Sequence, residues 1–320
     1  MKHDSARVLV ALWAIGLLIS AHTAAEERLT VTSEGLWMLS ERTFHLMEQA
    51  AQGDIGAERE LGYRYLMRYG VPFNPAEGLR LLLRAAERGD GHAAATLGYV
   101  HREGLGVKRD VVASARWYRR AADQGIASAQ TNLGYAYVRG IGVDYDPARG
   151  FGWIANAAEQ DDPIAMRSLA YMYEHGLGVE RDAAQAVAWY QEAAVLGDAP
   201  AQTAIGNFYR VGANVVRDFA LAEFWYLQAA DQGDADGQHA LAEMYHAGQG
   251  VAADPVLALF WYSLASQQRT MAPALVATLR AKLTLRENVM VEQAIDEWWE
   301  VRHRYTGVVA PELPVLSALD

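Results

Sequence analysis

Cysteine is absent from the 320 residues of this chain. Its absence excludes disulfide bonds, thiolate metal ligands and a cysteine nucleophile. A fold built from this sequence therefore has to be stabilised by packing and hydrogen bonds alone. Since 52% of the residues are hydrophobic, the chain has enough apolar side chains for a long continuous core.

Positive charge is also in short supply. The chain has 28 lysines and arginines against 39 aspartates and glutamates, which gives a formal net charge of −11 at pH 7. A protein that binds nucleic acid needs a basic face for the phosphates. The charge balance therefore predicts no nucleic-acid partner, although it does not exclude a local basic strip.

Motifs of several common catalytic sites are missing as well. There is no G-x-S-x-G, no serine three residues before a lysine, and no phosphate-binding glycine loop after a strand. The best metal candidate is the trio His239, Glu243 and His246, whose spacing places them on one helix face. It lacks the H-E-x-x-H order of zinc enzymes and has no evident fourth ligand. The sequence therefore predicts no catalytic residue, no metal and no cofactor.

Long apolar runs are missing too. The run Val8–Ile19 has 12 residues, which is short for a helix that spans a bilayer. It follows a basic start and precedes small residues, so residues 1–25 resemble a secretory signal peptide that would be cleaved before Glu26. We expect an exported, periplasmic protein with no membrane contact after removal of the signal. Secretion and an uncleaved N-terminal anchor are the alternatives, and a lipoprotein is not expected without cysteine.

What the chain does contain is a sequence period of 36 residues. A leucine or isoleucine, a tryptophan and an alanine each return at this interval. A fixed period of this size over six copies is typical of a solenoid, in which neighbouring repeats share one core. The leucine series is Leu61, Leu97, Leu133, Leu169, Ile205 and Leu241, and the tryptophan series is Trp117, Trp153, Trp189, Trp225 and Trp261.

Each copy contains two predicted helices, which we name helix A and helix B. In the second copy, helix A carries Gly98, whose small size indicates close approach of a neighbouring helix. Gly104 ends helix A, because glycine readily adopts the left-handed conformation of helix C-termini. Asp110 then begins helix B as its N-cap. In the fifth copy Asn214 replaces the second loop glycine, and asparagine is the next-best residue at positive φ.

The repeated pattern A-x-x-x-L-G-x-x-Y-x-x-G-x-G-V-x-x-D, followed by W and A-A-x-x-G, resembles the SLR (Sel-one-like repeat) family, which is related to tetratricopeptide repeats. The resemblance covers about two-thirds of the chain. It implies an all-α fold, an α/α superhelical solenoid of six helical-hairpin repeats. It also implies a non-enzymatic protein-binding scaffold whose A helices line the concave surface.

The organisation expected from this pattern has five parts. Residues 1–25 form the signal peptide, 26–53 an N-terminal capping helix, 54–268 the six repeats, 269–305 C-terminal capping helices and 306–320 a flexible tail. A lone helix from Glu34 to Gln52 would form the first cap, because solenoid ends need a polar outer face. The periodic tryptophans are expected in the core, since large aromatics dominate core burial.

The candidate site is a strip of variable residues on one face of the A helices. Tyrosine and arginine recur there, and these residue types often anchor protein interfaces. The expected partner is another protein or peptide, and the alternative for the tyrosines is packing between repeats. The predicted partner-binding residues are Tyr63, Tyr99, Arg102, Tyr135, Arg167, Tyr171, Glu174 and Arg210.

Two other functions stay open at the level of the sequence. One is a glycan- or peptidoglycan-directed binder or hydrolase, in which aromatic rings would stack on sugars and paired carboxylates would act on them. The carboxylates Glu174 and Glu243 lie two repeats apart, which argues against a shared cleft. The other is a secreted factor that engages host proteins. The preferred hypothesis is that the protein is an adaptor or regulator in the bacterial cell envelope.

Overall fold

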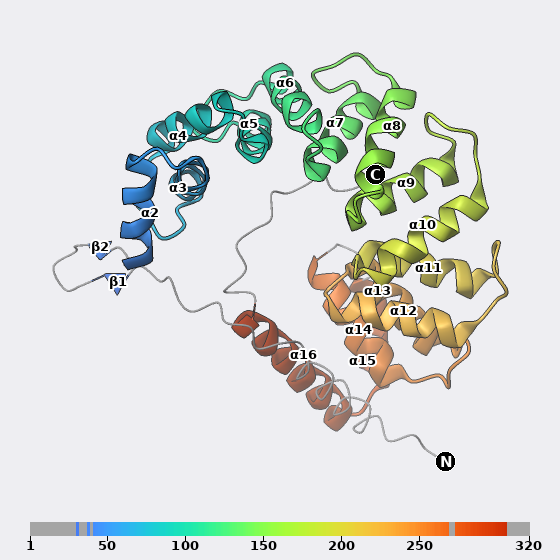
Figure 1. Cartoon of the computed structure of the whole chain (residues 1–320). Helices are drawn as coiled ribbons and strands as arrows, with labels where there is room; N and C mark the ends of the chain where they lie inside the picture. The colour runs from blue at the N-terminus through green and yellow to red at the C-terminus, as the bar shows by residue number, and fades with distance from the viewer. Residues whose placement is uncertain (1–29, 32–36, 39–40, 269–272, 306–320) are drawn as a thin grey trace. The chain divides into compact units, whose positions relative to one another are not determined.

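A computed structural model describes residues 30–31, 37–38, 41–268 and 273–305 (Figure 1). The predicted signal peptide and the predicted tail lie outside the described residues. Two short strands, β1 (Thr30–Val31) and β2 (Trp37–Met38), pair antiparallel, and the elements that follow are all helices. The all-α fold class is confirmed.

Six pairs of helices follow one another between residues 55 and 268. Their bounds confirm the prediction of two helices in each repeat of the solenoid. The A helices are α3 (Ile55–Met67), α5 (Gly91–Glu103), α7 (Ala127–Arg139), α9 (Pro163–His175), α11 (Ala199–Val211) and α13 (Ala235–Ala247). The B helices are α4 (Pro75–Glu87), α6 (Val111–Ala122), α8 (Pro147–Ala158), α10 (Ala183–Val195), α12 (Phe219–Asp231) and α14 (Pro255–Gln268).

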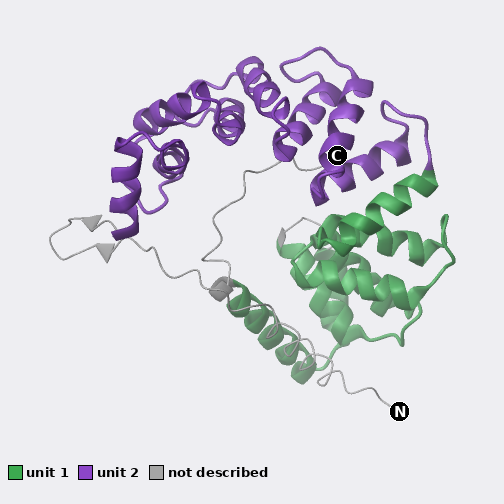
Figure 2. Cartoon of the chain, viewed as in Figure 1, with its two compact units in different colours: residues 1–24, 183–310 green, residues 25–182, 311–320 purple. Residues whose placement is uncertain are grey.

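The chain divides into two compact units, and the division falls between the two helices of repeat 4 (Figure 2). Unit 2 holds the helices from α2 (Glu41–Ala51) to α9, and unit 1 holds the helices from α10 onward. Each unit has its own apolar core. Leu97 and Leu133 lie in the core of unit 2, and Leu241 and Leu259 lie in that of unit 1.

The loop and cap residues behave as the sequence predicts. Gly104 ends α5 in the left-handed conformation, with φ of 76°. Asp110 begins α6, and its carboxylate accepts hydrogen bonds from the backbone N–H groups of Val112 and Ala113. In the fifth repeat Asn214 has φ of 58°, which confirms its role as a substitute for glycine.

The glycines of helix A confirm the predicted close approach and identify what approaches. A Cβ atom on Gly98 would lie 2.7 Å from the ring of Tyr118, and one on Gly206 would lie 2.6 Å from the ring of Tyr226. Both tyrosines are the residue directly after the periodic tryptophan of helix B. The glycine therefore makes room for the ring of the partner helix within its own repeat.

This register limits the prediction that the tryptophans are core residues. Trp261 is 1% exposed, whereas Trp117 and Trp153 are half-buried against the core of unit 2, and Trp189 and Trp225 are half-buried. The residue after each tryptophan faces helix A instead, and it is buried in every repeat from the second to the sixth. Those buried residues are Tyr118, Ile154, Tyr190, Tyr226 and Tyr262.

The two ends of the repeat array carry additional helices. At the start, α2 is shorter than the predicted helix from Glu34 to Gln52, because Trp37–Met38 forms β2. At the other end, α15 (Pro273–Lys282) and α16 (Leu285–Tyr305) pack against α14, and α16 buries Val291 and Ile295. No helix within the described ranges combines the length and the apolar character that crossing a bilayer requires.

Candidate protein-binding face

The A helices of unit 2 form the surface that carries most of the candidate residues. Each contacts the A helix of the next repeat, α3 with α5, α5 with α7 and α7 with α9. Figure 1 shows α3 and α5 on the inner side of the curve that unit 2 describes, with α4 and α6 on its outer side. Equivalent positions on successive A helices therefore become neighbours on one face.

Tyr63 and Tyr99 are half-buried on this face. Burial raises the pKa of Tyr63, and the neighbouring Tyr99 and Glu60 raise it further. The guanidinium carbon of Arg102 lies 5.2 Å from the centroid of the Tyr99 ring, a cation–π distance. Tyr63, Tyr99 and Arg102 therefore lie close to one another on the face formed by α3 and α5.

Tyr135 does not present its ring to solvent. Its side chain is 1% exposed, and its hydroxyl forms a hydrogen bond with the hydroxyl of Ser168 on α9. The prediction that Tyr135 faces a partner is wrong, because the short Ser168 side chain lets the ring pack between two successive A helices. At this repeat the alternative reading, packing between repeats, is correct.

Two of the remaining candidates of unit 2, Arg102 and Tyr171, contact neighbouring side chains. Arg102 donates from Nη1 to Oδ1 of Asn132 at 2.7 Å and from Nε to Oε1 of Glu103 at 2.7 Å. The Tyr171 ring stacks on His175 with 3.9 Å between ring centroids. Arg167 and Glu174 are half-buried. The face is therefore partly ordered before any partner arrives.

A hollow of about 230 Å³ opens between α3 and α5, beside Tyr63. Its lining includes Arg59, which forms an ion pair with Asp90 at 2.8 Å, and the exposed His92. His92 was not among the residues predicted from the sequence, because it lies in the first turn of α5 and not at a position where tyrosine and arginine recur. A polar aromatic residue at a variable position of helix A was the feature that could have indicated it.

Arg210 belongs to unit 1 and takes part in a separate polar group. Its Nε donates to the hydroxyl of Tyr226 at 3.2 Å, and its Nη1 lies 3.8 Å from Oε2 of Glu243. Glu243 in turn lies 3.9 Å from Nδ1 of His239. In the described part of the chain, no cluster of three or more histidine or carboxylate side chains is arranged to hold a metal ion.

Known proteins with solved structures resemble the chain over most of its length. It is similar to a Sel1 repeat protein from Oxalobacter formigenes, with 28% identity and a TM-score of 0.67, over 84% of this chain and 99% of that one. It is also similar to a protective antigen of uropathogenic Escherichia coli that displays an SLR fold, with 28% identity and a TM-score of 0.64. That match covers 94% of this chain, which spans 62% of the length of the E. coli protein. Among curated proteins, none matches.

The repeats also match a family profile directly. The Sel1 repeat is found six times in succession, at residues 55–90, 91–126, 127–162, 163–198, 199–234 and 235–269. Sel1 repeat proteins typically mediate protein–protein interaction and are generally scaffolds without enzymatic activity. Because consecutive matches run from residue 55 to residue 269, the chain belongs to the Sel1 repeat family.

Proposed function

We propose that this chain is a non-enzymatic adaptor or regulator of the bacterial cell envelope that binds another protein through the A-helix face of unit 2. The observation that carries the proposal is the adjacent pair of half-buried rings, Tyr63 and Tyr99, with Arg102 beside the second ring. These are residue types that supply much of the binding energy in protein interfaces.

Partial burial of the two rings supports this role physically. Tyrosine offers a large contact area and has only two side-chain torsions to fix on binding. Rings already packed against the scaffold lose little further freedom, so less free energy is lost when a partner orders them. The hollow beside Tyr63 is large enough for a side chain of the partner, and His92 and Arg59 give it polar walls.

The envelope location rests on the amino-terminal sequence. Residues 1–25 have the basic start, short apolar run and small residues of a signal peptide. We expect the mature chain to begin at Glu26 and to be released with the periplasm by osmotic shock. N-terminal sequencing of the released protein checks the cleavage site. Recovery of the intact chain with the membrane pellet would contradict cleavage.

Capture from envelope extract tests the binding face. The mature chain with an affinity tag is compared with a Tyr63→Ala/Tyr99→Ala variant, and captured proteins are quantified by mass spectrometry. A control variant, Tyr69→Ala/Tyr145→Ala, removes two tyrosines that are exposed in the loops after helix A. We expect a specific protein to be lost only with the first variant. For the purified partner, the dissociation constant should rise about tenfold or more.

The same measurements can refute the proposal. If both double variants capture the same proteins in the same amounts as the unmodified chain, the A-helix face of unit 2 is not the binding surface. Circular dichroism of each variant establishes that its helices are intact.

A further inference from the structure

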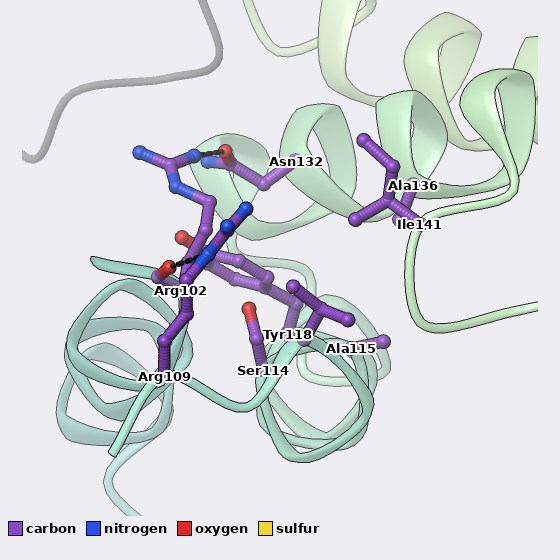
Figure 3. A pocket seen from close by; sticks show the side chains of 9 residues that line it. Arg102, Arg109, Ser114, Ala115, Tyr118, Asn132, Ala136 and Ile141 are labelled. Atoms are coloured by element: carbon purple, nitrogen blue, oxygen red, sulfur yellow. Dashed lines mark hydrogen bonds between the residues drawn. The ribbon is translucent and has the colours of Figure 1, made fainter. Parts of the chain in front are cut away.

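A small pocket lies where α5, α6 and α7 meet in unit 2 (Figure 3). It encloses about 60 Å³ and has an apolar side formed by Val111, Ala115, Ala136 and Ile141. Its polar lining consists of two arginines, two hydroxyl groups and one amide, from Arg102, Arg109, Ser114, Tyr118 and Asn132. Figure 3 shows the side chains of Arg102, Arg109 and Tyr118 grouped together, with Asn132 bonded to Arg102.

The hydroxyl of Tyr118 is the unusual group in this pocket. The residue is 4% exposed, and among the described residues its oxygen has no hydrogen-bond partner. Burial raises the pKa of Tyr118, so the group keeps its proton at neutral pH and can donate. A buried donor without an acceptor is unfavourable, and folded proteins seldom leave one.

The equivalent tyrosine of repeat 5 shows that the scaffold does not require this arrangement. Tyr226 donates its hydroxyl proton to Oδ1 of Asn207 at 2.7 Å and accepts from Nε of Arg210 at 3.2 Å. In repeat 2 the position of Asn207 is occupied by Tyr99, which carries no amide oxygen and forms no hydrogen bond with the Tyr118 hydroxyl. The Nε atom of Arg102, which corresponds to that of Arg210, donates to Glu103 instead.

The charges around the pocket indicate what would complete it. Arg109 donates from Nε to the backbone oxygen of Arg102 at 3.0 Å, and Arg102 donates to Asn132, so both guanidinium groups are positioned at the pocket. The carboxylate of Glu103 bonds Nε of Arg102 and is 43% exposed. Two cations and a hydroxyl donor favour a ligand that carries negative charge and only accepts hydrogen bonds.

We propose that this pocket binds one carboxylate group of the protein partner. A carboxylate is planar, accepts only, and matches the fork of a guanidinium group. The enclosed volume accommodates such a small group but not a sugar ring or a nucleotide. Arg102 lies beside both the Tyr99 ring and this pocket, so a segment that crosses the binding face could place its carboxylate there. The inference rests on the proposed function and specifies the chemistry of the partner.

The test uses small carboxylates and needs no knowledge of the partner. Amide chemical shifts of the ¹⁵N-labelled mature chain are followed while sodium acetate replaces sodium chloride at constant ionic strength. We expect saturable shifts confined to α5, α6 and α7. Tyr118→Phe and Arg109→Ala should each weaken the binding of acetate about tenfold or more. The matched control, Tyr226→Phe, should bind acetate as the unmodified chain does.

Two further probes distinguish the sources of the carboxylate. N-acetylglycine presents a main-chain carboxylate, and N-acetylglutamic acid α-amide presents only a side-chain carboxylate. Tighter binding of the first indicates recognition of a chain terminus, and tighter binding of the second indicates an acidic side chain. Absence of saturable acetate binding, equal affinity in Tyr118→Phe, or tighter binding of sulfate than of acetate would overturn the proposal.

Failure of this proposal can be told apart from failure of the proposed function. If acetate binding depends on Tyr118 while Tyr63→Ala/Tyr99→Ala captures its partner normally, the carboxylate pocket is supported and the proposed binding face is wrong. If acetate does not bind while that variant loses its partner, the binding face is supported and the proposed carboxylate pocket is wrong.

Discussion

Repeats 2 and 5 place a tyrosine at the same position of helix B, yet the two hydroxyl groups have opposite surroundings. The rings of Tyr118 and Tyr226 both pack against a glycine of helix A. The hydroxyl of Tyr226 is bonded on both sides, whereas that of Tyr118 has no hydrogen-bond partner among the described residues. The 36-residue period therefore determines where a ring lies, and the variable residues of helix A determine what its polar end meets.

The same contrast extends to the A-helix faces of the two repeats. In repeat 2, Arg102 lies against the Tyr99 ring, and the lining of a pocket includes that arginine. In repeat 5, Arg210 bonds Tyr226 and approaches Glu243 of the next repeat. An arginine at one repeat position thus lines a pocket in one copy and bonds the tyrosine of helix B in the other.

The largest expected effect on stability is a difference between two neighbouring residues of repeat 5, the buried tyrosine and the tryptophan before it. Tyr226 is completely buried, so Tyr226→Ala should lower the free energy of unfolding by about 3–5 kcal/mol. Trp225 is only half-buried, and Trp225→Ala should cost about half as much. Urea unfolding followed by circular dichroism measures both. A greater loss for Trp225→Ala would show that the register of helix B has been misassigned.

Exchanging the equivalent loop residues of repeats 2 and 5, Gly106 and Asn214, should have an intermediate effect on the free energy of unfolding. Gly106 has φ of 71°, and a Cβ atom there would lie 2.4 Å from Cβ of Pro75. Gly106→Asn therefore forces a clash that should cost about 1–3 kcal/mol, even though asparagine tolerates positive φ. Asn214→Gly in repeat 5 removes a side chain, introduces no clash and should change stability by less than about 0.5 kcal/mol.

Thermal unfolding of the two loop variants provides the comparison. Equal melting temperatures would mean that the loop of repeat 2 can move away from Pro75, which would contradict its tight packing. A marked loss in Asn214→Gly alone would show that the asparagine side chain stabilises the loop of repeat 5.

Much of the fold was predictable from the sequence, because each helix is specified locally and then repeated. Gly104 and Asp110 act through the backbone of their own turn, so their conformations follow from residue type. The tryptophan prediction held for Trp261 but only in part for Trp225, because Trp225 and Tyr226 share the same period, and a period alone does not say which one faces helix A. The glycine opposite, Gly206, carried that information.

The candidate site was less predictable because it depends on contacts between repeats. Tyr63 and Tyr135 occupy the same repeat position, but only Tyr135 meets a serine on the next A helix. Burial therefore changes from one repeat to the next through a residue 33 positions away. The missing acceptor of Tyr118 likewise depends on which residues repeat 2 places at variable positions, a tyrosine at 99 and a glutamate at 103.

The smallest expected effect is also the most direct test of the comparison between repeats 2 and 5. Tyr226→Phe removes a hydroxyl that bonds Asn207 and Arg210, and it should cost about 1 kcal/mol. Tyr118→Phe removes a buried hydroxyl that bonds no described residue, so it should leave stability unchanged or raise it by a few tenths of a kcal/mol. Both changes keep the ring that packs against the helix A glycine.

Tyr226→Phe and Tyr118→Phe are compared by urea unfolding in chloride buffer and again with acetate added. In chloride, only Tyr226→Phe should shift the midpoint to lower urea. If acetate binds the Tyr118 pocket, it should stabilise the unmodified chain and Tyr226→Phe, since a ligand of the native state shifts the unfolding equilibrium. Acetate should stabilise Tyr118→Phe less than it stabilises the unmodified chain. Equal losses for the two variants in chloride would mean that the Tyr118 hydroxyl already has a bonding partner, and the contrast between repeats 2 and 5 would disappear.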